Sequence, residues 1–252
     1  MANKILNTPG GTGQLPAGKV IVGNGYTGDL ATFNGKLFIF TDPYNPLDLP
    51  SNTVRVRTND GNAPFKDMSK ATHATYDTAV LVPGTTDVYD VYKSGPSFEN
   101  LFYWSMNIVE VLGANSSGIT NTQYMFKNCE YLTTISTVFD TSSVTNMLGM
   151  FHNCETLLST PVFDTSNVTN MRAMFEFAYK LTTVPLFNTS KVIDMERMFH
   201  FCGDVQSGAL ALYQQASSQS NPPTNHTFTF DKCGENTETG SAELAQIPYE
   251  WR

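Results

Sequence analysis

Each of the four cysteines stands three residues after a phenylalanine, and cysteine thiols can bind a metal or form disulfides. The pairs are Phe126 and Cys129, Phe151 and Cys154, Phe199 and Cys202, and Phe230 and Cys233. In two related segments the cysteine position holds Ser105 and Ala178, which indicates a slot for a small buried residue. We therefore expect four buried, reduced thiols rather than a disulfide framework.

Two histidines, His152 and His200, occupy the same position in two segments of the repeat, and Lys127 and Glu176 occupy that position in two others. Imidazoles are common metal ligands, but these two belong to segments two repeats apart. At the spacing of stacked strands they would lie about 10 Å from each other, too far to share one metal ion. The pattern favours a solvated surface ridge.

Acidic and amide side chains form a second aligned set: Asp140 and Asp164 fall in one column with Asn115 and Asn188. Stacked carboxylates can bind calcium, but the Gly-rich nonapeptide pattern of calcium-binding repeats does not occur. Short side chains before Thr-Ser are typical of turns, where they accept hydrogen bonds from backbone N–H groups, so we expect turn capping. No nucleophile-elbow, zinc-protease, P-loop or dinucleotide motif occurs. The sequence therefore assigns no catalytic residue, cofactor or metal, and a glycan hydrolase with paired carboxylates is the enzymatic alternative.

Composition narrows the function classes. The 252 residues hold 15 Lys and Arg against 23 Asp and Glu, and a net charge of −8 argues against binding to nucleic acid or to anionic lipid. The polar residues are mostly uncharged, with 31 Thr and 21 Asn, which is typical of a turn-rich structural or binding protein. No apolar run reaches the ~18 residues of a membrane span, and the first residues lack a signal-peptide pattern. We therefore expect no membrane insertion, and synthesis in the cytoplasm.

An internal repeat must position all of these residues. Its phenylalanine recurs after 25, 24 and 24 residues, at positions 126, 151, 175 and 199, and a degenerate copy begins at Leu101. The most regular units have a Met-x-x-Met-Phe-x-x-Cys run, complete at 147–154 and 195–202, with the i, i+3, i+4, i+7 spacing of a helical face. A short β-prone run and an Asp-Thr-Ser or Asn-Thr-Ser turn accompany it. Units this small cannot fold alone, so they must stack over a shared core that buries Phe151 and Phe175. The pattern predicts a right-handed solenoid with one strand and one short helix in each unit.

The Met-Phe-x-x-Cys and Phe-Asp-Thr-Ser-x-Val-Thr-x-Met columns resemble the leucine-rich repeats of BspA-like surface proteins, a variety common in gut bacteria and their phages. The resemblance covers residues 101–205 closely and the C-terminal segment more loosely, through Phe230 and Cys233. It implies a binding or adhesion module and not a catalyst. Ser105, Thr160 and Ala178 depart from the pattern, but all three are small.

The predicted fold class is a β-rich α/β solenoid of the BspA-like leucine-rich-repeat type, with a small N-terminal antiparallel β domain and an extended arm. Its predicted segments are an attachment arm over 1–35, a small capping β domain over 36–100, five repeats over 101–205, and a C-terminal helix and cap over 206–252. In the β domain, alternating runs predict strands at 36–40, 53–57, 78–82 and 87–92. Ser207 is expected to cap a helix over 208–216, and Ile247 and Trp251 are expected to cover the last repeat.

We expect a non-enzymatic structural or binding protein, namely a capsid- or tail-associated decoration or fibre protein on the surface of a phage virion. A chain that lacks a signal but carries surface-protein repeats fits assembly in the host cytoplasm. Its partners would be other virion proteins and a host surface protein or glycan, and a homo-oligomer is compatible with the sequence. The alternative is a bacterial cell-surface adhesin with leucine-rich repeats.

Exposed positions of the strand column are the candidate binding residues, because a solenoid presents one such set in each coil and weak contacts add along the row. They are Tyr131, Thr133, Thr156, Leu158, Lys180 and Thr182. The apolar anchors of the attachment arm are Ile5, Leu15, Val20 and Ile21. A surface selected only for solubility is the competing interpretation of the strand column.

Overall fold

The computed structural model of the chain describes residues 20–22, 26–33, 36–40, 49–64 and 74–252. Strands β1 (Val20–Val22), β2 (Tyr26–Phe33) and β3 (Lys36–Phe40) form a three-stranded antiparallel sheet in that order. The strand expected at 36–40 is therefore confirmed. Residues 20–22 and 26–33 were expected to belong to an extended arm, and their backbone instead pairs in this sheet.

A second sheet has five strands in the order β5-β6-β4-β7-β8. These are β4 (Thr53–Thr58), β5 (Thr78–Leu81), β6 (Val88–Tyr92), β7 (Ile108–Asn115) and β8 (Thr134–Ile135). Pairing is antiparallel except between β7 and β8, which are parallel. The strands expected near 53, 78 and 87 are confirmed. Because β7 belongs to the first repeat unit, the boundary expected at residue 100 falls inside one sheet.

The predicted fold class, an α/β solenoid of the leucine-rich-repeat type, is wrong. The regular structure of the described residues is the mixed five-stranded sheet, the three-stranded sheet, two short α-helices, α1 (Ala209–Ser217) and α2 (Glu238–Leu244), and a 3-10 helix, η2 (Tyr249–Trp251). Both α-helices follow the repeats. Within the described repeats, the Met-x-x-Met-Phe-x-x-Cys runs contain no helix, and after β7 the only strand is the two-residue β8.

Positive φ angles explain why these runs are not helical. They recur two positions before and two positions after each core phenylalanine, and an α-helix cannot include such left-handed residues. The residues before the phenylalanine are Asn100, Tyr124, Gly149, Ala173, Arg197 and Phe228, and those after it are Trp104, Asn128, Asn153, Phe177, Phe201 and Lys232. The runs are therefore series of turns. The apolar i, i+3, i+4, i+7 spacing is common to these turns and to a helix, and it misled the prediction.

Each 24-residue layer of turns, here called a rung, has two sides with opposite hydrogen-bond direction. On the side that carries the core phenylalanine, the turn side, N–H groups alternate between a local turn and the following rung. Thus His152 N–H donates to the Gly149 carbonyl at 3.1 Å, and Phe151 N–H donates to the Met174 carbonyl at 2.8 Å. On the opposite side, the strand side, most N–H groups that join rungs donate to the preceding rung, as from Leu158 to the Thr133 carbonyl at 3.1 Å, whereas those of Ala114 and Val184 donate to the following rung.

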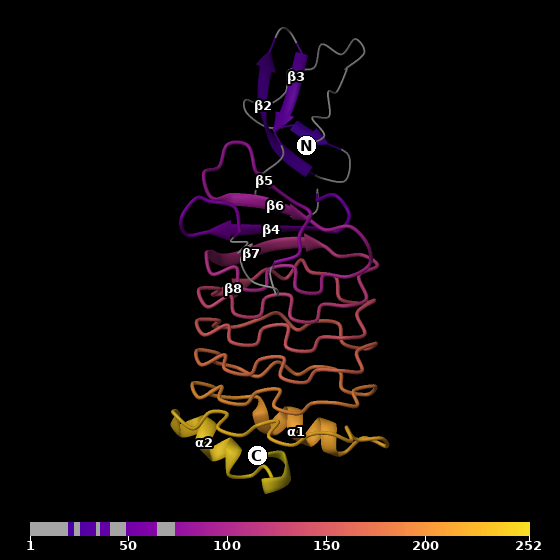
Figure 1. Cartoon of the computed structure of the whole chain (residues 1–252), viewed down its shortest axis with the longest axis vertical. Coiled ribbons are helices and arrows are strands. Elements are labelled where there is room, and N and C mark those ends of the chain that lie inside the picture. The colour runs from indigo at the N-terminus through magenta and orange to yellow at the C-terminus, as the bar shows by residue number, and fades with distance from the viewer. Residues whose placement is uncertain (1–19, 23–25, 34–35, 41–48, 65–73) are drawn as a thin grey trace.

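The core is a continuous column of stacked side chains. Neighbouring phenylalanine rings from Phe102 to Phe199 lie 5.1 to 5.4 Å apart and are nearly parallel, and Phe230 extends the column at 6.0 Å. The expected burial of Phe151 and Phe175 is confirmed. Figure 1 shows the five-stranded sheet at one end of the stacked rungs and α1 and α2 at the other.

The C-terminal cap differs in part from expectation. Helix α1 lies where a helix was expected, but Ser207 does not cap it; the N-cap residue is Gly208, with φ 98°. The Ser207 carbonyl instead accepts the N–H of Val184. Ile247 and Trp251 are buried, as expected of residues that cover the last repeat. No helix in the described part of the chain has the length and apolarity that crossing a membrane requires.

Candidate functional site

The six candidate residues of the strand column lie on the strand side in two adjacent columns. Several of their polar groups hold the rungs together: the Thr133 hydroxyl donates to the Val109 carbonyl at 2.9 Å, and the Thr182 hydroxyl donates to the Leu158 carbonyl at 3.1 Å. The remaining members make similar contacts or face solvent. Thr156 donates to the carbonyls of Glu130 and Leu132, Lys180 pairs with Asp204 at 2.8 Å, and Tyr131 and Leu158 are 50% and 46% exposed.

The four expected arm anchors are only partly within the described chain. Ile5 and Leu15 lie outside the described residues. Val20 and Ile21 lie in β1, where their backbones pair with Gly28 and Thr27 of β2.

The Asp and Asn column caps turns, as expected. The side-chain oxygen of Asp140 accepts the N–H of Ser142 at 3.0 Å, and Asp164 does the same with Ser166. Hydrogen bonds from the backbone and hydroxyl of Ser166 lower the pKa of Asp164. Asn188 repeats this contact with Ser190, whereas Asn115 lies in β7 and donates to the Leu49 carbonyl.

The cysteines are free and fully buried, which confirms the small buried slot. The thiol of Cys154 lies 3.1 Å from the Phe126 carbonyl of the preceding rung, to which it can donate, and Cys202 is placed in the same way against Phe175. Burial raises the pKa of both thiols well above the ordinary value. Among the described residues, no cluster of three or more His, Cys, Asp or Glu side chains is arranged to hold a metal ion.

The turn side carries an interlocked row of ionisable side chains, here called the histidine ridge: His152, Glu176, His200 and Asp231. One carboxylate serves both imidazoles, because Glu176 lies 3.3 Å from Nδ1 of His152 and 3.0 Å from Nδ1 of His200. Nε2 of His200 lies 3.1 Å from Asp231 in the next rung. The expectation was a row of solvated side chains. These four side chains instead contact one another from rung to rung, and Glu176 is only 7% exposed.

The chemistry of the ridge follows from its donors and acceptors. Burial alone would raise the pKa of Glu176, but contacts from His152 and His200 outweigh it, and the net pKa is lowered. A neutral imidazole has a single N–H donor, so only the protonated form of His200 can donate toward both Glu176 and Asp231. Phe177 and Phe201 pack against the His200 ring and limit its access to water.

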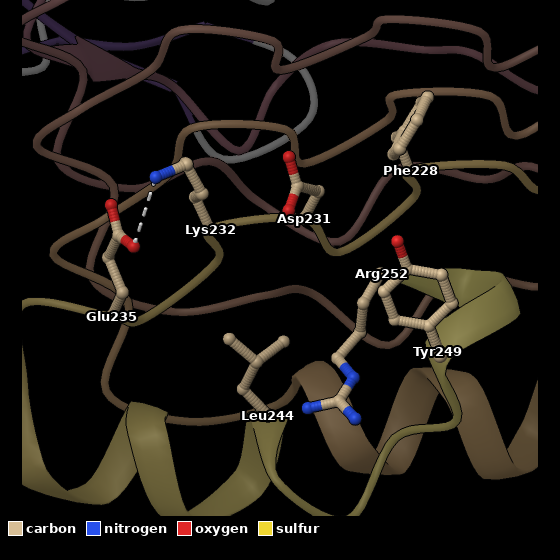
Figure 2. Close-up of a pocket in the computed structure, with 7 residues that line it drawn as sticks. All are labelled: Phe228, Asp231, Lys232, Glu235, Leu244, Tyr249 and Arg252. Atoms are coloured by element: carbon tan, nitrogen blue, oxygen red, sulfur yellow. Dashed lines mark ion pairs between the residues drawn. The ribbon is translucent and has the colours of Figure 1, made fainter.

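The ridge ends at an open pocket of about 370 Å³ beside the C-terminal helices. Its lining residues are Phe228, Asp231, Lys232, Glu235, Leu244, Tyr249 and Arg252. Figure 2 shows Phe228 and Tyr249 on one side, the Lys232–Glu235 pair on the other, and the Arg252 guanidinium near Leu244. Asp231 therefore belongs to both the ridge and the pocket.

Sequence reasoning missed this pocket. Asp231 occupies the same column of the repeat as His200. Because α1 is inserted between Phe199 and Phe230, however, this last spacing is longer than 24 residues, and the alignment of Asp231 with His200 is not evident from the sequence. The Phe230-x-x-Cys233 signature was the available signal, because it marks one further rung. The aromatic and charged residues of the cap carry no repeat pattern at all.

On the strand side, Glu130 and Glu155 occupy the same column of successive rungs. Burial and then the charge of Glu155 raise the pKa of Glu130. Neither carboxylate lines the pocket at the C-terminal end.

A comparison with protein families finds one match. Residues 96–211, somewhat less than half of the chain, match the model of a family described as "Mycoplasma protein of unknown function, DUF285". The matched segment covers most of the rungs and ends in α1. No curated protein and no solved structure matches the chain.

Proposed function

We propose that this protein is a non-enzymatic binding and structural module that presents fixed rows of side chains to a partner. The observation that carries this proposal is the histidine ridge, because a continuous buried core holds its four ionisable groups at constant spacing and its last member opens into a pocket. Rigid, pre-positioned polar groups beside exposed aromatic rings suit the recognition of a partner.

The proposed setting is the surface of a phage virion, with a host surface protein or glycan as the external partner. Two observations support it: the resemblance of the repeats to those of BspA-like surface proteins, and four buried thiols, which fit folding in a reducing cytoplasm. Residues 1–35 are proposed to join the protein to other virion proteins.

Mass spectrometry of purified particles tests this setting directly, and the protein is expected among the structural components. A chain that begins at Gly35 lacks β1 and β2, and it is expected to keep the five-stranded sheet and the rungs folded but not to join particles. Incorporation of this shortened chain at wild-type occupancy would place the attachment elsewhere.

A bacterial cell-surface adhesin is the second candidate, and the matched family is described from a bacterial genus, which favours it. Surface labelling of intact bacteria separates the two settings. An adhesin is labelled on cells in the absence of phage, whereas a virion protein is labelled only on particles.

A further inference from the structure

One edge of the five-stranded sheet is open. Strand β5 is the outermost strand of that sheet, and among the described residues it pairs only with β6. The N–H of Val82 donates to the carbonyl of Val88 in β6 at 2.8 Å, so the backbone groups of Val82 face β6. Because successive residues of a strand direct these groups to opposite sides, Val80 faces β6 as well, whereas Ala79 and Leu81 face outward.

The outward backbone groups of β5 are unpaired. Within the described part of the chain, neither the N–H nor the carbonyl group of Ala79 or Leu81 has a hydrogen-bond partner. The three-stranded sheet of β1, β2 and β3 does not pair with this edge either. Each of the two residues therefore presents one donor and one acceptor, at the spacing of a β-ladder, and an added strand can use all of them.

The edge also lacks the features that protect most edge strands, which are charged side chains, proline and bulges. Residues 78–82 have the sequence Thr-Ala-Val-Leu-Val, with neither a charge nor a proline, and the register between β5 and β6 is regular. Val80 is 56% exposed and Leu81 is 42% exposed. An uncharged, apolar and regular edge of this kind favours pairing with another strand.

The strand is complementary to a second copy of itself. When two β5 strands lie antiparallel with Val80 opposite Val80, Ala79 of each copy lies opposite Leu81 of the other. Each of these two residue pairs exchanges two N–H···O bonds, so the pairing supplies four. On one face a small side chain meets a large one, and on the other face two valines meet. Asp77 falls opposite Pro83, so no like charges oppose each other over residues 77–83.

We propose that two copies of this protein associate through their β5 edges, as a symmetric dimer in which the two five-stranded sheets join into one. A second copy is the occupant because one register satisfies the outward groups of both strands, matches side-chain sizes and avoids like charges. The two-fold pairing uses up both edges, so the assembly closes at two copies. Its interface is small, which is typical of weak association. The inference goes beyond the proposed function and holds in either of its settings.

Sedimentation velocity of the full chain tests the association. The protein is expected to pass from monomer to dimer between about 1 μM and about 1 mM. Val80→Lys places like charges opposite each other and should weaken dimerisation at least about tenfold. The control is Val162→Lys, at a side chain that is 67% exposed outside the edge, and it should dimerise as the wild type does. A wild-type chain that stays monomeric up to about 1 mM, or undiminished dimerisation of folded Val80→Lys, overturns the proposal.

Single added cysteines test the register. In the two-fold pairing Val80→Cys brings two thiols together with their Cα atoms about 4.5 Å apart, within the range of a disulfide. Thr78→Cys leaves the two Cα atoms about 13 Å apart, which is too far. Oxidation with copper phenanthroline, which removes two electrons from each pair of thiols, should therefore give a covalent dimer of Val80→Cys alone. The four native cysteines are buried. Equal yields from the two variants, or no covalent dimer from Val80→Cys, overturn the two-fold arrangement.

Discussion

Glu176 accepts a hydrogen bond from Nδ1 of His200 at 3.0 Å, across the boundary between two successive rungs. Its other oxygen lies 3.3 Å from His152 in the preceding rung. One buried carboxylate thus connects three rungs, in a molecule whose other contacts between rungs are mostly backbone hydrogen bonds and stacked apolar side chains.

Replacement of this carboxylate should make stability depend less on pH. The folded-state pKa of Glu176 is lowered below its usual 4.5, so its ionised form stabilises the protein above that pH, and this stabilisation is lost as pH falls through the folded pKa. Glu176→Gln is expected to reduce the free energy of unfolding by about 1–3 kcal/mol near neutral pH and by less at an acid pH below the folded-state pKa of Glu176. Urea denaturation at both pH values measures this. Glu238→Gln, at an exposed site, is the control, and an equal loss for Glu176→Gln at both pH values would contradict the prediction.

Truncation of a core ring should be costly. Phe175 is fully buried and stacks on Phe151 at 5.4 Å and on Phe199 at 5.1 Å, so Phe175→Ala leaves a cavity in the continuous column. The expected loss in the free energy of unfolding is about 3–5 kcal/mol. Leu186→Ala, at a side chain that is 55% exposed, should change it by less than about 0.5 kcal/mol. Similar losses for the two variants in denaturant titrations would show that the column is not the core.

The cysteines should behave as unreactive packed thiols. Denatured, non-reduced protein is expected to give four free thiols in a colorimetric titration. The folded protein should react slowly, because the thiols are buried and their raised pKa values keep them protonated. Cys154→Ala should cost little, since Ala178 fills the same slot one rung later. A count of two or none, or rapid labelling of the folded protein, would refute the prediction.

Replacement of Gly149 by alanine should lower the free energy of unfolding more when Tyr124 is present than when it is absent. Gly149 has φ 54°, and a Cβ added there would lie 2.5 Å from the Tyr124 ring. Gly149→Ala is expected to cost more than the ~1–2 kcal/mol of left-handed strain alone, because the ring must move. In a Tyr124→Ala background the same change should cost only the strain, and thermal unfolding of the four proteins of this double-mutant cycle measures the difference. An unchanged cost would place the clash elsewhere.

The repeat columns made burial predictable, but not the local backbone. The phenylalanine, methionine and cysteine positions are buried as their periodicity implies, because a unit of 24 residues must share its apolar side chains with its neighbours. The Met-x-x-Met-Phe-x-x-Cys runs were predicted to be helical because the spacing of apolar residues carries no information about the backbone φ angles. Asn128 and Asn153 at left-handed positions were a usable signal, since asparagine tolerates positive φ, but Phe177 and Phe201 at the same position conceal it.

The candidate site was harder to predict than the core. Sequence alignment brought His152, Glu176 and His200 into one column, but it could not show that the carboxylate is buried between the imidazoles. Phe177 and Phe201 pack against the imidazoles from positions with positive φ, which the repeat pattern does not reveal. The pocket is formed in part by Leu244, Tyr249 and Arg252 of the C-terminal cap. The cap has no repeat, so its residues cannot be aligned with those of the rungs.

The opposite hydrogen-bond directions of the two sides have an electrical consequence. Peptide dipoles on the turn side point one way along the stack, and most of those on the strand side point the other way, so the two sets partly cancel within each rung. Added rungs therefore build a weaker end-to-end field than the same number of peptide units aligned in an α-helix. A local polarity is added at the last rung, where the N–H groups of Phe228 and Lys232 have no acceptor among the described residues.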